Sequence, residues 1–277
     1  MSVGIRTAVR AGARRTASRD GLVLALAFAA IGVVGVVGGQ TLLRDAAEPA
    51  LETLRTRPTA ETGFTPREVR TVADALDATT PLALGVPASV ASGLVVLAGV
   101  LRETLRIVGV RTFAADPTSL TRDRLRPLVL PTLNGVAGGF AVWFLVGLGG
   151  VLGILAVVVG GAVVALFLAT SFFFLRQEIA VENRTFVDAL NESWRVASGH
   201  RLELLGLGVA VVALTLVPLV AVRALFGVLF GPAVAWVAWV CLGGPAAVFG
   251  TATVTHAYTQ LRAEPREPEL GRPRIDR

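Results

Sequence analysis

Few side chains in this sequence have the types and spacing that catalysis needs. General acid–base chemistry requires titratable groups within hydrogen-bonding reach of one another. Glu178, Glu182 and His200 are the best set available, and nothing in their spacing shows that they meet. The two histidines and the single cysteine, Cys241, are too widely spaced for a recognisable metal site. We therefore expect no enzyme activity, no metal and no cofactor.

A second kind of chemistry is the binding of a weakly polar solute inside a helical bundle. Asn134, Thr170 and Ser171 lie within otherwise apolar stretches of the sequence. Polar side chains in such stretches either line a cavity or form hydrogen bonds to a neighbouring helix. We treat the three as candidate cavity-lining residues and, for Asn134, keep a hydrogen bond to a neighbouring helix as the alternative.

Membrane-spanning helices would have to position these residues. The chain has 277 residues, is 53% hydrophobic and 17% charged, and contains long stretches without any Arg, Asp or Glu. A hydrocarbon core about 30 Å thick needs roughly 20 apolar residues at 1.5 Å per residue. The sequence therefore predicts an all-α fold, a polytopic transmembrane helical bundle with six spans. The spans are placed at about 21–43, 81–101, 128–147, 151–175, 204–222 and 232–258.

The distribution of arginine predicts the orientation of the bundle. Of the 26 basic residues, all arginines, 20 fall in the N-terminal tail, the segments 102–126 and 176–203, and the C-terminal tail. Positive charge favours the cytoplasmic side of a membrane. Both termini are therefore expected to be cytoplasmic, and six spans independently require them to share one face. This bias also explains the net charge of +6, so we expect the lipid bilayer as partner and no nucleic acid.

The chain is expected to have three parts. Residues 1–20 form a basic cytoplasmic tail, 21–261 the six-span membrane domain, and 262–277 a disordered cytoplasmic tail. A cleavable signal peptide is the alternative for the N-terminus. We disfavour it because the apolar run after the arginines is longer than the usual 7–15 residues.

Short amphipathic helices are predicted outside the spans. Thr185 is a suitable N-cap, and Phe186, Leu190 and Trp194 then recur at helical spacing, which makes them a candidate membrane-surface or partner-binding face. A connector packed under the bundle is the alternative. A similar helix is expected in the N-terminal 20 residues, and another starts at Thr65 with Glu68 as the capping-box partner.

The segment from Glu182 to Trp194 supports a family resemblance. Its Ala189-Leu190 followed by Ser193-Trp194 resembles a recurring element of uncharacterised six-helix integral membrane proteins. The pattern is also similar to the membrane domain of some glycerophosphoryl diester phosphodiesterases. Their catalytic chemistry belongs to a separate soluble domain, so the resemblance implies a multi-pass membrane protein and carries over no catalytic residue.

These features predict a multi-pass protein of the cell membrane with no enzymatic role. The leading hypothesis is a membrane scaffold or accessory subunit with a protein partner or as a homo-oligomer. The alternative is a transporter or permease component for an apolar or weakly polar solute or lipid.

Overall fold

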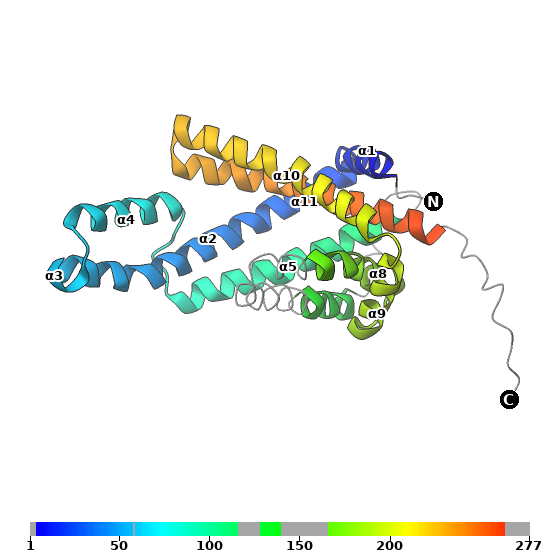
Figure 1. Cartoon of the computed structure of the whole chain (residues 1–277), viewed down its shortest axis with the longest axis horizontal. Helices are drawn as coiled ribbons and strands as arrows, with labels where there is room; N and C mark the ends of the chain where they lie inside the picture. The colour runs from blue at the N-terminus through cyan, green and yellow to red at the C-terminus, as the bar shows by residue number, and fades with distance from the viewer. Residues whose placement is uncertain (1–3, 58, 116–127, 140–165, 264–277) are drawn as a thin grey trace, which may run out of the picture.

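A computed structural model describes residues 4–57, 59–115, 128–139 and 166–263. Within these ranges every regular element is a helix, as the sequence predicts. The labelled helices are α1 (Ile5–Thr16), α2 (Arg19–Thr56), α3 (Thr59–Thr62), α4 (Pro66–Thr79), α5 (Ala88–Ala114), α8 (Leu175–Glu182), α9 (Phe186–Ala197), α10 (Arg201–Phe230) and α11 (Pro232–Ala263) (Figure 1). Residues 129–139 are also helical.

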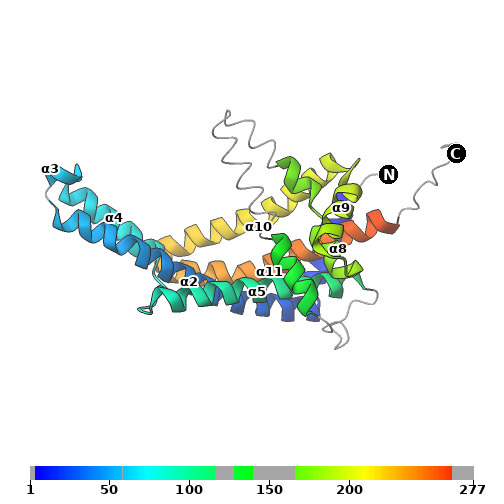
Figure 2. The ribbon, with the colours of Figure 1, turned by 90° about the horizontal axis from the view of Figure 1, so that it is seen from below.

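Three long helices form the centre of the bundle. The α2 helix packs against both α5 and α11, and α10 packs against α11. Leu24 and Phe28 of α2, Val108 and Phe113 of α5, and Val248 of α11 belong to one buried apolar cluster. Figures 1 and 2 show α1, α8, α9 and the last turns of α11 at one end of the molecule, with α3 and α4 at the other.

Three of the described helices are long and apolar enough to cross a membrane: α2, α10 and α11. They contain the predicted spans 21–43, 204–222 and 232–258. Residues 140–147 of the predicted span 128–147 and residues 151–165 of the predicted span 151–175 lie outside the described residues. The coarse prediction of an all-helical protein with apolar helices long enough to cross a membrane therefore agrees with the structure, whose described residues contain three candidate spans. The number of six spans stays a prediction.

The predicted span 81–101 differs from the structure in its first third. Gln40 and Thr41 of α2 accept hydrogen bonds from the backbone N–H groups of Leu82 and Leu84, and α5 starts only at Ala88. The charge-free helical part then runs from Ala88 to Leu101, about 21 Å at 1.5 Å per residue. This length is shorter than a hydrocarbon core of about 30 Å. Hydropathy alone could not show that these seven residues leave the helix to bind α2.

Residues 44–80, which connect the first two predicted spans, are largely helical. The α2 helix continues through Pro49 to Thr56, and α4 folds back against it. The Nη2 of Arg44 lies 3.1 Å from the Oδ1 of Asp77, an exposed ion pair between the two helices. Thr65 and Glu68 form the predicted capping box at the start of α4.

The predicted N-terminal helix is present as α1, with a packing face that the arginine spacing did not indicate. Ala8 and Gly12 are its buried residues, and α1 packs against α11. A Cβ on Gly12 would overlap the hydroxyl of Thr253, so only glycine allows this close approach. The helix is therefore fixed to the bundle as well as facing outward with its arginines.

Candidate functional site

Buried and half-buried charged residues gather around α8 in two clusters. We call Glu103, Arg106 and Arg176 the Glu103 cluster, and Glu178, Arg184, Glu192, Arg195 and Arg262 the Glu178 cluster. Because Arg176 and Glu178 are both on α8, this short helix joins the two. The clusters connect α5, α8, α9 and α11, which are distant in the sequence.

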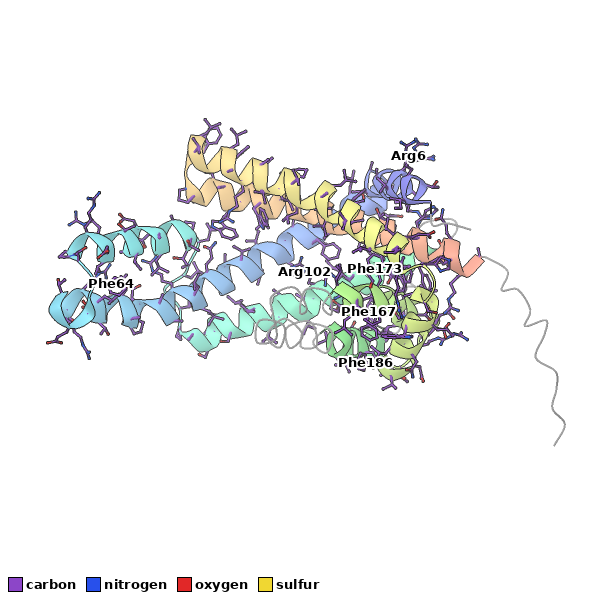
Figure 3. The ribbon with its side chains drawn as sticks, in the orientation of Figure 1. Arg6, Phe64, Arg102, Phe167, Phe173 and Phe186 are labelled. Carbon is purple, nitrogen blue, oxygen red and sulfur yellow. The ribbon has the colours of Figure 1, made fainter. Side chains whose placement is uncertain are left out.

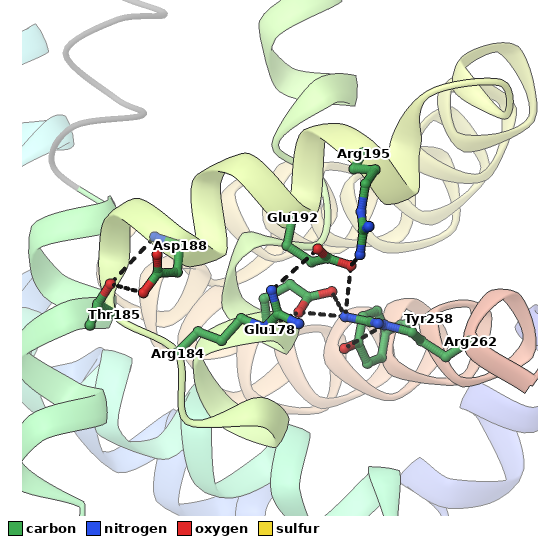
Figure 4. Close-up of polar contacts among 8 residues, drawn as sticks. All are labelled: Glu178, Arg184, Thr185, Asp188, Glu192, Arg195, Tyr258 and Arg262. Carbon is green, nitrogen blue, oxygen red and sulfur yellow. Dashed lines mark hydrogen bonds and ion pairs between the residues drawn. The ribbon is translucent and has the colours of Figure 1, made fainter. Parts of the chain in front are cut away.

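The Glu178 cluster is centred on a carboxylate with no solvent-exposed surface. The Nη2 of Arg262 lies 2.6 Å from Oε1 and 2.7 Å from Oε2 of Glu178 (Figure 4). Arg184 lies 3.4 Å from the same carboxylate, and Arg262 also donates from Nε to the hydroxyl of Tyr258 at 3.2 Å. Charge-assisted hydrogen bonds of this kind are stronger than neutral ones. They hold the end of α11 against α8.

Glu192 extends the cluster to α9. Its carboxylate lies 2.6 Å from Nη2 of Arg195, 3.2 Å from Nη1 of Arg184 and 3.3 Å from Nη2 of Arg262. Three guanidinium groups therefore surround one carboxylate that is almost fully buried. Buried charges persist only when they are paired and hydrogen-bonded. This pairing connects α8, α9 and α11 through buried charges.

The Glu103 cluster lies against a predicted membrane span. Glu103 is buried and its carboxylate accepts hydrogen bonds from Arg106 at 3.2 Å and Arg176 at 2.7 Å. A Cβ built on Gly135 would lie 3.3 Å from the carboxylate of Glu103, and one on Gly139 would lie 3.7 Å from Arg176. The predicted span 128–147 contains no charged residue, but Glu103 and Arg176 lie beside its glycines Gly135 and Gly139.

A backbone contact fixes the other side of α8. Nε of Arg111 on α5 donates to the carbonyl of Ala180 at 2.8 Å, and its Nη2 donates to Oδ1 of Asn183 at 2.6 Å. Asn183 ends α8 with φ of +52°. Asparagine adopts this left-handed conformation more readily than most residues. The turn between α8 and α9 is thus held by both its backbone and its side chain.

The chain matches the model of one protein family over most of its length. The family model described as "Domain of unknown function (DUF7847)" matches residues 3–261. The chain belongs to the DUF7847 family. No curated protein and no solved structure matches it. The family match runs from α1 into the last turn of α11 of this DUF7847 chain and includes both charged clusters except Arg262. It neither supports nor opposes the resemblance to the phosphodiesterase membrane domain.

The predicted surface helix of this DUF7847 protein is present as α9, with Thr185 as its N-cap. Phe186 and Leu190 pack against a buried cluster formed by Leu175, Ile179 and Ala189. Trp194 is 40% exposed, and its ring lies 5.4 Å from that of Phe167 and 4.8 Å from the guanidinium of Arg201. Phe186 and Leu190 thus lie against the bundle, which favours the connector alternative for α9.

The candidate cavity-lining residues occupy different surroundings. Asn134 is half-buried, and Thr170 and Ser171 are buried. The hydroxyl of Thr170 donates to the carbonyls of Leu166 and Phe167, and the carbonyl of Ser171 accepts from the hydroxyl of Ser193 at 3.2 Å. The Thr170 hydroxyl thus bonds within its own helical turn, and Ser171 contacts α9 through its backbone, while its buried hydroxyl has no hydrogen-bond partner among the described residues. The cavity-lining role of the three residues stays a prediction.

The two glutamates of the candidate catalytic set have different surroundings. Glu178 is bound by Arg262 and Arg184, whereas Glu182, four residues later, is exposed. Within the described ranges, no group of three or more His, Cys, Asp or Glu residues could hold a metal ion. The partners that sequence reasoning missed are Arg262 and Glu192. Only the Glu192–Arg195 spacing on α9 could have signalled a local pair.

The clusters predict a specific acid sensitivity. Burial alone would raise the pKa of Glu192, but the hydrogen bond from Arg195 and the charges of Arg195, Arg184 and Arg262 lower it below its ordinary value of 4.5. The stabilisation from Glu192 is therefore complete above pH 4.5 and is lost as the pH falls through the lowered pKa. Burial raises the pKa of Glu178, while its hydrogen bond with Arg262 acts in the opposite direction.

We expect the Glu192→Gln variant to lose less stability than the wild type when the pH falls below 4.5. The measurement is the unfolding midpoint of the detergent-solubilised protein as a function of pH. Glu182→Gln, an exposed change on the neighbouring helix, serves as the control and should keep the wild-type acid dependence. An unchanged acid slope in Glu192→Gln would contradict this role for Glu192.

Proposed function

We propose that this DUF7847 protein is a non-enzymatic, multi-pass protein of the cell membrane that acts as a scaffold or accessory subunit. The observation that carries the proposal is the state of the Glu178 cluster. Its two carboxylates are buried and each is bound by at least two arginines. Such an arrangement stabilises one relative position of α8, α9 and α11, which suits a rigid surface for a partner more than a catalytic centre.

We further propose six spans with both termini in the cytoplasm. The arginine distribution supports this topology. The position of α1 beside the last turns of α11, at one end of the bundle, is consistent with it. For the test, Cys241 is replaced by serine and single cysteines are introduced at Arg67 in α4 or at Ala115 after α5. A membrane-impermeant maleimide should label position 67 from outside and leave position 115 unlabelled, and the reverse pattern would invert the topology.

The scaffold role is tested by affinity purification of the full chain in mild detergent. Mass spectrometry of the co-purifying material should find a protein in stoichiometric amount, or a homo-oligomer of defined size. The bundle disrupted by Glu178→Gln should lose that partner, whereas the exposed Glu182→Gln should retain it. A monodisperse monomer without any protein partner would contradict the proposal.

A second candidate function is the handling of an apolar or weakly polar solute or lipid. It is favoured by one specific observation, a cavity of about 400 Å³ between α2, α5 and α11. Its volume lies in the range of ligand pockets. In the same purification, a bound lipid without a protein partner would favour this second function.

A further inference from the structure

The cavity between the three central helices has mostly apolar walls. Its walls include Gly32 and Gly35 of α2, Val95 and Arg102 of α5, and Trp239 and Gly243 of α11. From Val95 to Arg102 it follows α5 for about 10 Å at 1.5 Å per residue. Val95 is exposed, so the cavity opens along one side of α5. Gly32 and Gly35 lie in the middle of the charge-free stretch of α2, which places the opening beside lipid in a membrane.

One end of this cavity carries uncompensated positive charge. Arg102 is exposed, and within the described part of the chain no carboxylate lies at ion-pairing distance from it. Glu103, the neighbouring carboxylate, is already bound by Arg106 and Arg176. Two guanidinium groups therefore share the Glu103 carboxylate, and Arg102 has no carboxylate partner among the described residues. Arg102 is labelled in Figure 3, on the part of α5 that passes α2 and α11.

The positions of Arg102 and Arg106 on α5 show which end of the cavity is positively charged. Arg102 and Arg106 are four residues apart, so they lie on one face of the helix, with Arg106 nearer the end that carries α8 and α9. A long arginine side chain can extend along apolar surface toward an interface. An anion held between the two guanidinium groups would therefore lie at that end, with the apolar cavity continuing away from it.

We propose that this cavity binds one anionic glycerophospholipid. An acyl chain would lie between Gly32, Gly35 and Gly243, and the phosphate would be bound by Arg102 with Arg106. The match is one of charge and polarity, because the site is apolar along its length and positive at one end. Anionic lipids concentrate near basic groups at the cytoplasmic surface, at about 1 kcal/mol per residue. The inference goes beyond the scaffold role, and it deepens the second candidate function by naming the lipid class and its site.

The test is native mass spectrometry of the full chain in detergent, with added phosphatidylglycerol or phosphatidylcholine of identical acyl chains. We expect one phosphatidylglycerol to be retained in preference to phosphatidylcholine. Arg102→Gln should weaken phosphatidylglycerol retention about fivefold or more and abolish the preference. Arg67→Gln, an exposed arginine of α4 at the opposite end, is the matched charge control and should behave as wild type.

A second pair of variants tests the cavity itself. A Cβ at Gly243 meets nothing within 4 Å, so Gly243→Leu should fill the cavity without a backbone collision and lose lipid of both kinds. Gly39→Leu on α2 is the matched control, since its Cβ also meets open space and Gly39 is not part of the cavity wall. Size-exclusion chromatography confirms that each variant is folded.

Three results would overturn the proposal. They are wild-type protein without a retained phospholipid, equal retention in Arg102→Gln and Gly243→Leu, and replacement of the phospholipid by an excess of free fatty acid. Failure here is distinguishable from failure of the scaffold role, because the first concerns bound lipid and the second a co-purifying protein.

Discussion

Glu178→Gln is expected to destabilise the folded protein by about 2 to 3 kcal/mol, the largest effect of any conservative change in the charged clusters. The glutamine keeps the volume of the side chain but removes the charge that Arg262 contacts at 2.6 and 2.7 Å. Arg262 and Arg184 would then share Glu192 alone, leaving excess positive charge beside α8. The measurement is the free energy of unfolding in detergent mixtures with increasing SDS.

Two comparisons make the expected loss specific to the pair. Glu182→Gln changes an exposed carboxylate on the same helix and should stay within about 0.5 kcal/mol of wild type. The double variant Glu178→Gln with Arg262→Gln should lose less than the sum of the single variants, because the two side chains interact directly. Additive losses would show that the Glu178–Arg262 contact contributes no coupling energy.

Gly244→Ala is expected to separate α2 from α11 and destabilise the bundle by about 1 to 3 kcal/mol. An added Cβ at Gly244 would overlap the carbonyl oxygen of Ala25 and approach the Cβ of Ala29 at 3.1 Å. The obstacle is backbone, so no side-chain rotation can remove it. Small residues at helix crossings in membranes permit this kind of close approach.

The neighbouring residue gives the control for this prediction. Gly243 precedes Gly244 on α11, so its substitution also removes a glycine from this part of the helix. A Cβ at Gly243 would, however, meet nothing within 4 Å. Gly243→Ala should therefore leave the unfolding free energy almost unchanged or raise it slightly, because alanine favours helix over glycine. Equal destabilisation by the two changes would exclude the α2–α11 contact as the cause.

Local features of the sequence predicted local features of the structure well. The caps at Thr65 and Thr185 are present, and the charge-free stretches of α2, α10 and α11 lie in helices long enough to cross a membrane. These features depend on residues within a few positions of one another. A hydroxyl three residues before a backbone N–H, or an apolar run of sufficient length, has the same consequence in almost any surroundings.

The charged clusters could not be predicted in this way. Arg262 follows Glu178 by 84 residues, and Arg176 follows Glu103 by 73, so no spacing rule connects them. Each of these side chains taken alone is typical of a solvated loop. Only helix packing gives them a common buried location, where an unpaired charge would be costly and a pair therefore has to form.

The sequence by itself determined that the protein is helical, apolar and suited to a membrane, because composition and period act through short-range chemistry. The tertiary structure alone decided which charges are buried, which glycines lie against backbone and where a cavity remains between α2, α5 and α11. The physical reason is that burial, close approach and empty volume are properties of several helices together. None of them exists until residues far apart in the chain are packed side by side.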